Sequence, residues 1–217
     1  MSDIFREVDE EVRREQLKKL WERYSILIVA VAVLIVAGVG GWRGYEWWQT
    51  QKAAAAGAAF EAAAQLAEQG KHQEAEAAFA KIAADGTPSY RILAKLREAA
   101  ELAKRDPKAA IASYQVLVVD TSLGQIQQDL AAVRAGQLMV DQSPLAEITA
   151  LLEPRTAADR AFRHSARALL ALAAWRANDA VATRKWASMA LADTETPVST
   201  RGQVEMLLTL TGEAAKS

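Results

Sequence analysis

The hydrophobic and polar pattern changes most sharply between Arg23 and Arg43, where nineteen successive residues carry no charge. As a helix rising about 1.5 Å per residue, the segment from Tyr24 to Trp42 would span roughly 28 Å, close to the ~30 Å hydrocarbon core of a bilayer. A soluble surface helix would show a polar face, which this segment lacks. The pattern therefore predicts a transmembrane anchor helix over residues 24–42.

Aromatic residues flank this segment at both ends, as expected for rings that settle at the headgroup level of a bilayer. The predicted membrane-interface residues are Trp21, Tyr24, Trp42, Tyr45, Trp47 and Trp48. Two alternatives remain, a core helix of a soluble domain and a cleaved signal peptide. An uncleaved anchor is favoured over a signal peptide, because a long stretch rich in acids precedes the apolar core and bulky residues follow it.

Basic residues are unevenly distributed around the apolar segment. Only two follow it closely, Arg43 and Lys52, whereas five precede it within reach of the membrane: Arg13, Arg14, Lys18, Lys19 and Arg23. By the positive-inside rule, we predict a single-pass protein with a cytoplasmic N-terminus and an exported chain after about residue 48.

Beyond residue 53 the chain shows no convincing period-2 alternation, and its alanine-rich composition favours helices. Four helix starts are indicated by prolines that follow the potential N-cap residues Thr87, Asp106, Ser143 and Thr196. Residues 122–125 have the spacing of a capping box, and Pro154 suits a helix end. We predict helices over 53–69, 72–84, 88–104, 107–118, 123–140, 144–153, 157–177, 179–192 and 197–211. No clear cap separates the first of these from the anchor, so the two can form one helix.

A repeat appears when the predicted helix pairs are aligned. The segments QGKHQEAEAAFAKIAAD and KRDPKAAIASYQVLVVD match at an offset of 35 residues, and RANDAVATRKWASMALAD follows the same pattern. Each places a small residue four positions before an aromatic one, which puts both on one helix face. The predicted repeat-core pairs are Ala75 with Phe79, Ala110 with Tyr114, and Ala182 with Trp186. A period near 34 residues with this pattern is typical of tetratricopeptide repeats.

The predicted fold class is all-α, with a single N-terminal transmembrane helix followed by a tetratricopeptide-like stack of antiparallel helix pairs. The predicted organisation is a charged cytoplasmic arm over 1–23, the anchor over 24–42 and an interfacial aromatic segment over 43–52. A helical repeat domain over 53–211 and a tail over 212–217 complete the chain.

The net charge and the cysteine content argue against several classes of function. The formal net charge is −1, which argues against a nucleic-acid binder with a concentrated basic surface. No cysteine is present, so disulfides, thiolate metal sites and cysteine nucleophiles are excluded.

Only two histidines occur, His72 and His164. His72 lies near Glu68, Glu74 and Glu76, a conceivable metal group, but a solvated imidazole is the favoured interpretation. His164 and Ser165 are consecutive, so on a helix they do not face each other as a base and a nucleophile would. The chain also lacks G-x-S-x-G and H-E-x-x-H motifs. We predict that the protein is not an enzyme and has no catalytic residues, metal or cofactor.

Three arginines, Arg160, Arg163 and Arg167, have the spacing of a stripe along one helix. Such a stripe can contact an acidic or extended polypeptide. The favoured interpretation is a solvated face paired with nearby acids.

The order of segments resembles a known family. A short charged arm, an anchor that ends in GWR with an aromatic cluster, an AFEAA segment and tetratricopeptide-like repeats are similar to the YfgM-like ancillary subunit of the bacterial SecYEG translocon. The resemblance implies an inner-membrane protein with a periplasmic C-terminal domain. It also implies partners, the SecYEG translocon and a membrane-anchored periplasmic chaperone or folding factor. One departure from the repeat consensus is that Arg97 and Glu98 stand where Leu and Gly are expected.

A binding role fits a helical stack that lacks catalytic residues, because such stacks present a curved surface to a peptide or partner. We predict a membrane-anchored adaptor that binds unfolded or extended polypeptides or partner proteins and assists exported-protein folding or envelope chaperone traffic. The alternative is a structural scaffold for envelope or division complexes. A third hypothesis is a membrane-tethered hydrolase, which would need a cluster of polar side chains assembled from separate helix pairs.

Overall fold

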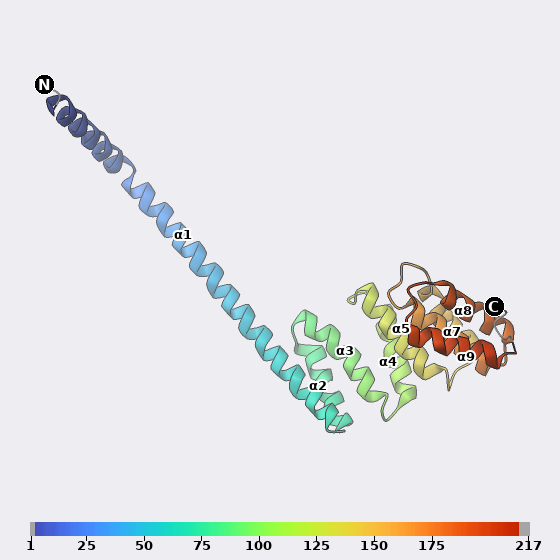
Figure 1. Ribbon diagram of the computed structural model, residues 1–217. Coiled ribbons are helices and arrows are strands. Elements are labelled where there is room, and N and C mark those ends of the chain that lie inside the picture. Colours follow the sequence, from blue (N-terminus) through green and yellow to red (C-terminus); the bar gives the residue numbers. More distant parts are fainter. Residues whose placement is uncertain (1–2, 213–217) are drawn as a thin grey trace. The chain divides into compact units, whose positions relative to one another are not determined.

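The computed structural model describes residues 3–212, except for the side chains of residues 3–13, 16, 17 and 20. Within this range all regular structure is helical, which confirms the predicted all-α fold. The α-helices are α1 Asp3–Glu68, α2 His72–Asp85, α3 Pro88–Leu102, α4 Pro107–Val119, α5 Gln125–Met139, α6 Leu145–Leu152, α7 Arg163–Arg176, α8 Ala180–Ala192 and α9 Val198–Leu210 (Figure 1). A 3-10 turn, η1, covers Glu153–Arg155. Of the predicted tail, residues 213–217 lie outside the described residues.

The chain divides into two compact units, Met1–Ala55 and Ala56–Ser217. Helix α1 begins in the first unit and ends in the second. The predicted helix over 53–69 is therefore no separate element, because it forms the last part of α1. Alanines at positions 53–56 have the highest helix propensity and no proline interrupts them, which explains the continuity.

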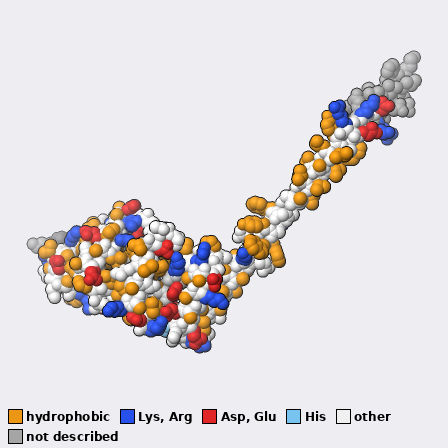
Figure 2. Space-filling view, turned by 180° about the vertical axis from the view of Figure 1, so that it is seen from behind, with side chains coloured by type: hydrophobic (Ala, Val, Ile, Leu, Met, Phe, Trp, Pro, Cys, Tyr) orange, Lys and Arg blue, Asp and Glu red, His pale blue; other side chains and the backbone are white. Residues whose placement is uncertain are grey.

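The first unit exposes its apolar residues. From Trp21 onward, α1 is long and apolar enough to cross a membrane by length and composition, and its most apolar stretch is entirely unburied (Figure 2). The exposed fraction is 72% at Trp42, and the other predicted interface residues, Trp21, Tyr24, Tyr45, Trp47 and Trp48, are exposed as well. Beside this stretch, the Lys52 Nζ atom lies 3.6 Å from the centroid of the Trp48 ring, a cation–π contact.

The second unit is a succession of packed helices. A turn at Gly70, whose φ of 74° favours glycine, reverses the chain between α1 and α2. The most extensive packing joins α2 to α3, α4 to α5 and α7 to α8, while α4 also contacts α3 and α9 contacts α7 and α8. Apart from the contact of α9 with α7, these contacts join sequence neighbours, which is the arrangement that short connections predict.

Apolar residues form two cores in the second unit. The smaller core holds Ala63, Ala75, Phe79, Ile82 and Ala94, with the half-buried Phe60 and Tyr90 packed against it. The Phe60 and Phe79 rings meet edge to face with centroids 5.2 Å apart. The larger core extends from Ala99 in α3 to Leu207 in α9.

Five of the six predicted repeat-core residues are buried, namely Ala75, Phe79, Ala110, Tyr114 and Trp186. Ala182 is half-buried and packs against the larger core, and the adjacent Thr183 is fully buried. The reason is local. Asp179 caps α8 by accepting a hydrogen bond from the Ala182 N–H at 2.9 Å, and the Thr183 hydroxyl donates to the Asp179 carbonyl at 2.7 Å, so Thr183 enters the core with its polar group satisfied.

Of the four N-cap residues predicted before prolines, only some occupy that position in the structure. Asp106 caps α4, since its carboxylate accepts a hydrogen bond from the Ala109 N–H at 2.9 Å. Thr87 is the N-cap residue of α3, but its side chain makes no capping bond. Helices α6 and α9 start one residue later than predicted, with the proline itself at the N-cap position, so the predicted N-cap roles of Ser143 and Thr196 are wrong.

The predicted capping box at residues 122–125 is also wrong. Helix α5 starts at Gln125 with Gly124 as its N-cap residue, and no side chain caps it. The predicted helix over 157–177 starts only at Arg163. Arginine contacts hold the preceding segment outside the helix: both Arg167 Nε and Nη2 donate to the Thr156 carbonyl, at 3.1 and 2.7 Å.

Candidate binding groove

A groove with a volume of about 670 Å³ lies between α3 and α5 in the second unit. One face of α3 supplies residues at a spacing of three and four, and one face of α5 does the same. Helix α4 packs against both helices and contributes Tyr114. The lining residues are Phe60, Leu93, Leu96, Arg97, Ala100, Glu101, Ala103, Lys104, Tyr114, Leu130, Arg134, Gln137 and Leu138.

Apolar side chains make up most of this lining. Leu93 has an exposed fraction of 48%, whereas Leu96, Leu130 and Leu138 are half-buried. Tyr114 is only 3% exposed, and burial raises the pKa of its phenol above the ordinary value although Arg134 opposes the shift. The phenol is therefore neutral at physiological pH. The groove thus offers an accessible apolar surface that includes the aromatic rings of Phe60 and Tyr114.

The groove lining contains more basic side chains than acidic ones. Arg97, Lys104 and Arg134 are exposed, and Arg134 donates to the Gln137 side-chain oxygen at 3.3 Å. The one acid in the lining, Glu101, is 5% exposed, and its Oε2 lies 2.7 Å from His72 Nδ1. Within the described part of the chain, no carboxylate lies within ion-pair distance of the three groove cations. The groove therefore carries an excess of positive charge.

The contact of His72 corrects the interpretation drawn from the sequence. The imidazole is not merely solvated among Glu68, Glu74 and Glu76, because it begins α2 and pairs with Glu101 on α3. The two residues are 29 positions apart, so local spacing contained no signal for this pair. One of the groove cations was weakly indicated by the sequence, because Arg97 departs from the repeat consensus.

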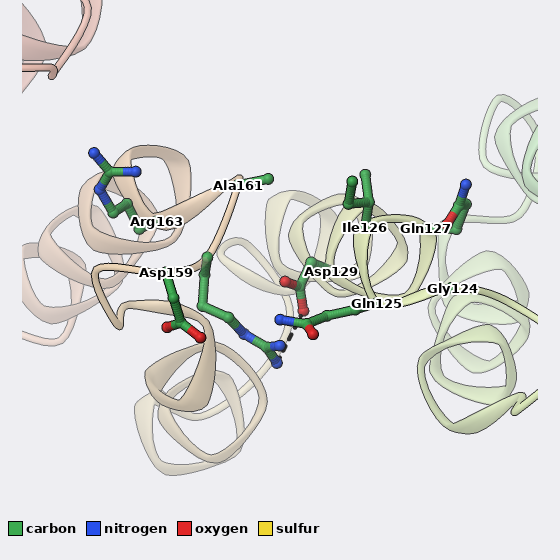
Figure 3. A pocket seen from close by; sticks show the side chains of 9 residues that line it. Gly124, Gln125, Ile126, Gln127, Asp129, Asp159, Ala161 and Arg163 are labelled. Atoms are coloured by element: carbon green, nitrogen blue, oxygen red, sulfur yellow. Dashed lines mark ion pairs between the residues drawn. The ribbon is translucent and has the colours of Figure 1, made fainter.

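A second pocket, of about 480 Å³, lies between the start of α5 and the segment before α7 (Figure 3). Asp129, with 1% exposure, lies 3.2 Å from Arg160 Nη2 and 3.5 Å from Arg155 Nε. Burial raises the pKa of the Asp129 carboxyl, and the two guanidinium groups oppose that shift. Neither carboxylate oxygen makes a well-aligned hydrogen bond. The ion pairs join α5 to the connection between α6 and α7. The charged residues of this pocket are therefore explained by their role in stabilising the fold.

The predicted arginine stripe does not form. Arg160 lies before α7 and turns to Asp129, while Arg163 and Arg167 lie on α7 and contact Asp193 Oδ2 at 2.7 and 2.8 Å. The expected pairing with acids is present, but the expected solvated face is wrong, because Arg167 is only 7% exposed. These arginines therefore stabilise the fold and present no continuous basic surface.

A potential metal group was not visible in the sequence. Ligand atoms of His164, Asp193 and Glu195 lie within 4.8 Å of one another. Hydrogen bonds from Arg163 hold the pKa of Asp193 well below its ordinary value, and Arg163 also pairs with Glu195. Burial, followed by the nearby Arg163, lowers the pKa of His164, whose Nδ1 lies 2.9 Å from the Thr196 hydroxyl oxygen. Positive charge already present at these carboxylates opposes a cation there.

Comparison with known families matches the profile of the tetratricopeptide repeat-like domain to residues 18–170. The chain belongs to this family. Searches of curated proteins and of solved structures found no match. The match includes α2 to α6, and therefore the residues of α3, α4 and α5 that line the groove, and it confirms the predicted tetratricopeptide-like repeat domain. Tetratricopeptide repeat-like domains mediate protein–protein interaction, and their stacked helices present extended binding surfaces.

Proposed function

We propose that this protein is a membrane-anchored adaptor whose tetratricopeptide repeat-like domain binds polypeptides or partner proteins. The accessible groove between α3 and α5 carries the proposal, because it combines an apolar surface with unpaired polar groups. Such a combination is typical of binding sites, where apolar contact supplies affinity and a few polar groups supply orientation. The role requires no catalytic residue, and we propose that the protein is not an enzyme.

A photo-crosslinking amino acid at Leu93 tests the groove directly. Leu93 lines the groove, whereas Val116 on α4 is 64% exposed and lies outside it, which makes Val116 the matched control. Adducts with polypeptides from Leu93 but not from Val116 are expected in cells. Equal adduct formation at both positions, or none at Leu93, would contradict a binding role for this groove.

We also propose that the apolar segment of α1 anchors the protein in the bacterial inner membrane, with the N-terminus in the cytoplasm and the repeat domain in the periplasm. Support comes from the length and exposure of the segment and from the basic residues that precede it. The chain has no cysteine, so Asp3→Cys and Ser217→Cys variants each carry one thiol. A membrane-impermeant reagent should label only the second in intact spheroplasts. The opposite labelling would overturn the orientation, and recovery of the intact chain in the soluble fraction would overturn the anchor.

The resemblance to YfgM-like subunits supports a finer proposal, that the adaptor works beside the SecYEG translocon with a membrane-anchored periplasmic chaperone and assists the folding of exported proteins. Affinity purification in mild detergent is the test. Recovery of Sec channel subunits or an envelope folding factor is expected. Recovery of division proteins in their place, together with localisation to the division site, would favour a structural scaffold.

A further inference from the structure

We propose that the groove between α3 and α5 selects extended polypeptide segments in which two acidic residues, three positions apart, flank apolar ones. This inference rests on the proposed binding function and adds the chemical class of the ligand. The juxtaposition that carries it is three exposed cations, Arg97, Lys104 and Arg134, around an apolar lining.

The charge of the lining is unbalanced for a structural reason. Most cations elsewhere in the second unit have nearby acids, as Arg105 has Glu76 at 2.8 Å and Lys95 has Asp120 at 2.6 Å. Within the described residues, the groove cations have no such partner, and the lining acid Glu101 is buried and held by His72. A ligand carboxylate would therefore meet unpaired cations without having to displace an internal one. A basic segment would be repelled at the same positions.

The spacing of the cations sets the spacing of the ligand acids. Arg97 lies on α3, and Lys104 lies in the turn after Ala103, the helical C-cap residue of α3, so continuation of the helical rise over these seven residues separates their backbones by about 10 Å. An extended chain in the polyproline II conformation advances about 3.1 Å per residue with three residues per turn, so the side chains of residues i and i+3 lie on the same side of the chain, about 9 Å apart. Carboxylates at i and i+3 of a segment that lies along α3 match the two cations. Apolar residues between them face the leucines of the lining.

Fluorescence anisotropy with three labelled peptides tests the selection, using the full-length protein in detergent micelles. The peptides share one leucine-containing sequence and differ only at positions i and i+3, which hold Glu, Gln or Lys. We expect affinity in the order Glu, Gln, Lys at low salt. Each exposed ion pair contributes roughly a 1.5- to 5-fold difference, and added salt should weaken the preference. Equal affinity for the three peptides would overturn the inference.

A charge-reversal variant, Arg97→Glu with Lys104→Glu and Arg134→Glu, should reverse the order so that the Lys peptide binds best. Reversal is a gain of binding, which an unfolded variant cannot produce. The matched control is Lys81→Glu with Arg91→Glu and Lys108→Glu, which changes the net charge equally at exposed positions outside the lining. The control should retain the preference for the Glu peptide. Loss of that preference in the control would assign the effect to overall charge and refute groove selection.

Failure of the inference and failure of the proposed function give different results. If the three peptides bind equally and Leu93→Arg abolishes binding, the groove binds polypeptide without charge selection, and only the inference fails. If none of the peptides binds and the crosslinker at Leu93 captures nothing, the binding function itself fails.

Discussion

Gly136 in α5 offers a sharp test of how closely the helices pack. A Cβ atom added to Gly136 would lie 2.8 Å from Leu152 Cδ1 and 3.2 Å from its Cγ. Both distances are shorter than an ordinary carbon–carbon contact of ~3.5–4.0 Å. Leu152 ends α6 and is fully buried, so its side chain has no open space into which to move. The glycine thus allows α5 and α6 to approach each other.

Two opposing effects determine how far Gly136→Ala changes the free energy of unfolding. Replacing glycine inside a helix with alanine stabilises by about 1 kcal/mol. Overpacking a filled core costs about 1–3 kcal/mol. We therefore expect a net loss of about 0–2 kcal/mol in the free energy of unfolding. In a Leu152→Ala background the clash is absent, so the same substitution should stabilise by about 1 kcal/mol, and the coupling between the two positions should be about 1–3 kcal/mol.

Urea denaturation of the full-length protein in detergent, followed by circular dichroism at 222 nm, measures both effects. Gly202→Ala in α9 is the matched control, because a Cβ atom at Gly202 would meet nothing within 4 Å. This control should stabilise by about 0.5–1 kcal/mol. The reasoning is refuted if Gly136→Ala stabilises as much as Gly202→Ala and its effect does not depend on Leu152.

Three further predictions concern other parts of the second unit. Phe79→Ala should lower the free energy of unfolding by about 3–5 kcal/mol, because the ring is fully buried; a thermal midpoint close to that of the wild type would contradict this. Asp106→Ala should cost about 1 kcal/mol through loss of the α4 cap, whereas Ser143→Ala should have little effect in the same denaturation assay. Hydrogen bonds from Lys95 and Ser122 lower the pKa of Asp120 from 3.8 to about 2, so the stability from this carboxylate is present above pH ~4 and is lost as the pH falls through about 2. Lys95→Met should weaken this acid dependence, which a titration of the Asp120 carboxyl by NMR would show; an unchanged pKa would contradict the contact.

Much of the fold follows from local patterns. Proline positions and alanine-rich stretches predicted most helices to within a few residues, because propensity and capping act over one or two turns. The largest error is the start of α7, where residues 157–162 were expected to be helical. Asp129 on α5 holds Arg160 within this segment and Arg155 just before it, and such distant contacts override local propensity.

Less of the candidate groove could be predicted from the sequence. The aromatic Tyr114 was expected as a repeat-core residue, and it is buried, but its presence in a groove lining depends on how α3 and α5 lie around α4. Nothing in the local pattern indicated that Arg97 and Arg134, 37 positions apart in the numbering, border one groove. The pairing of His72 with Glu101 likewise required the packing of α2 on α3.

The sequence by itself determined the helices, the apolar segment of α1 and the repeat, because each depends on residues within a few turns of one another. Only the tertiary structure decided which charges are paired and which are left free. Arg163 and Arg167 meet Asp193 across about 30 positions of chain, while Arg97, Lys104 and Arg134 are brought around one groove where no described carboxylate lies within ion-pair distance of them. Electrostatic partners are selected by distance in space, and a linear sequence does not contain that distance.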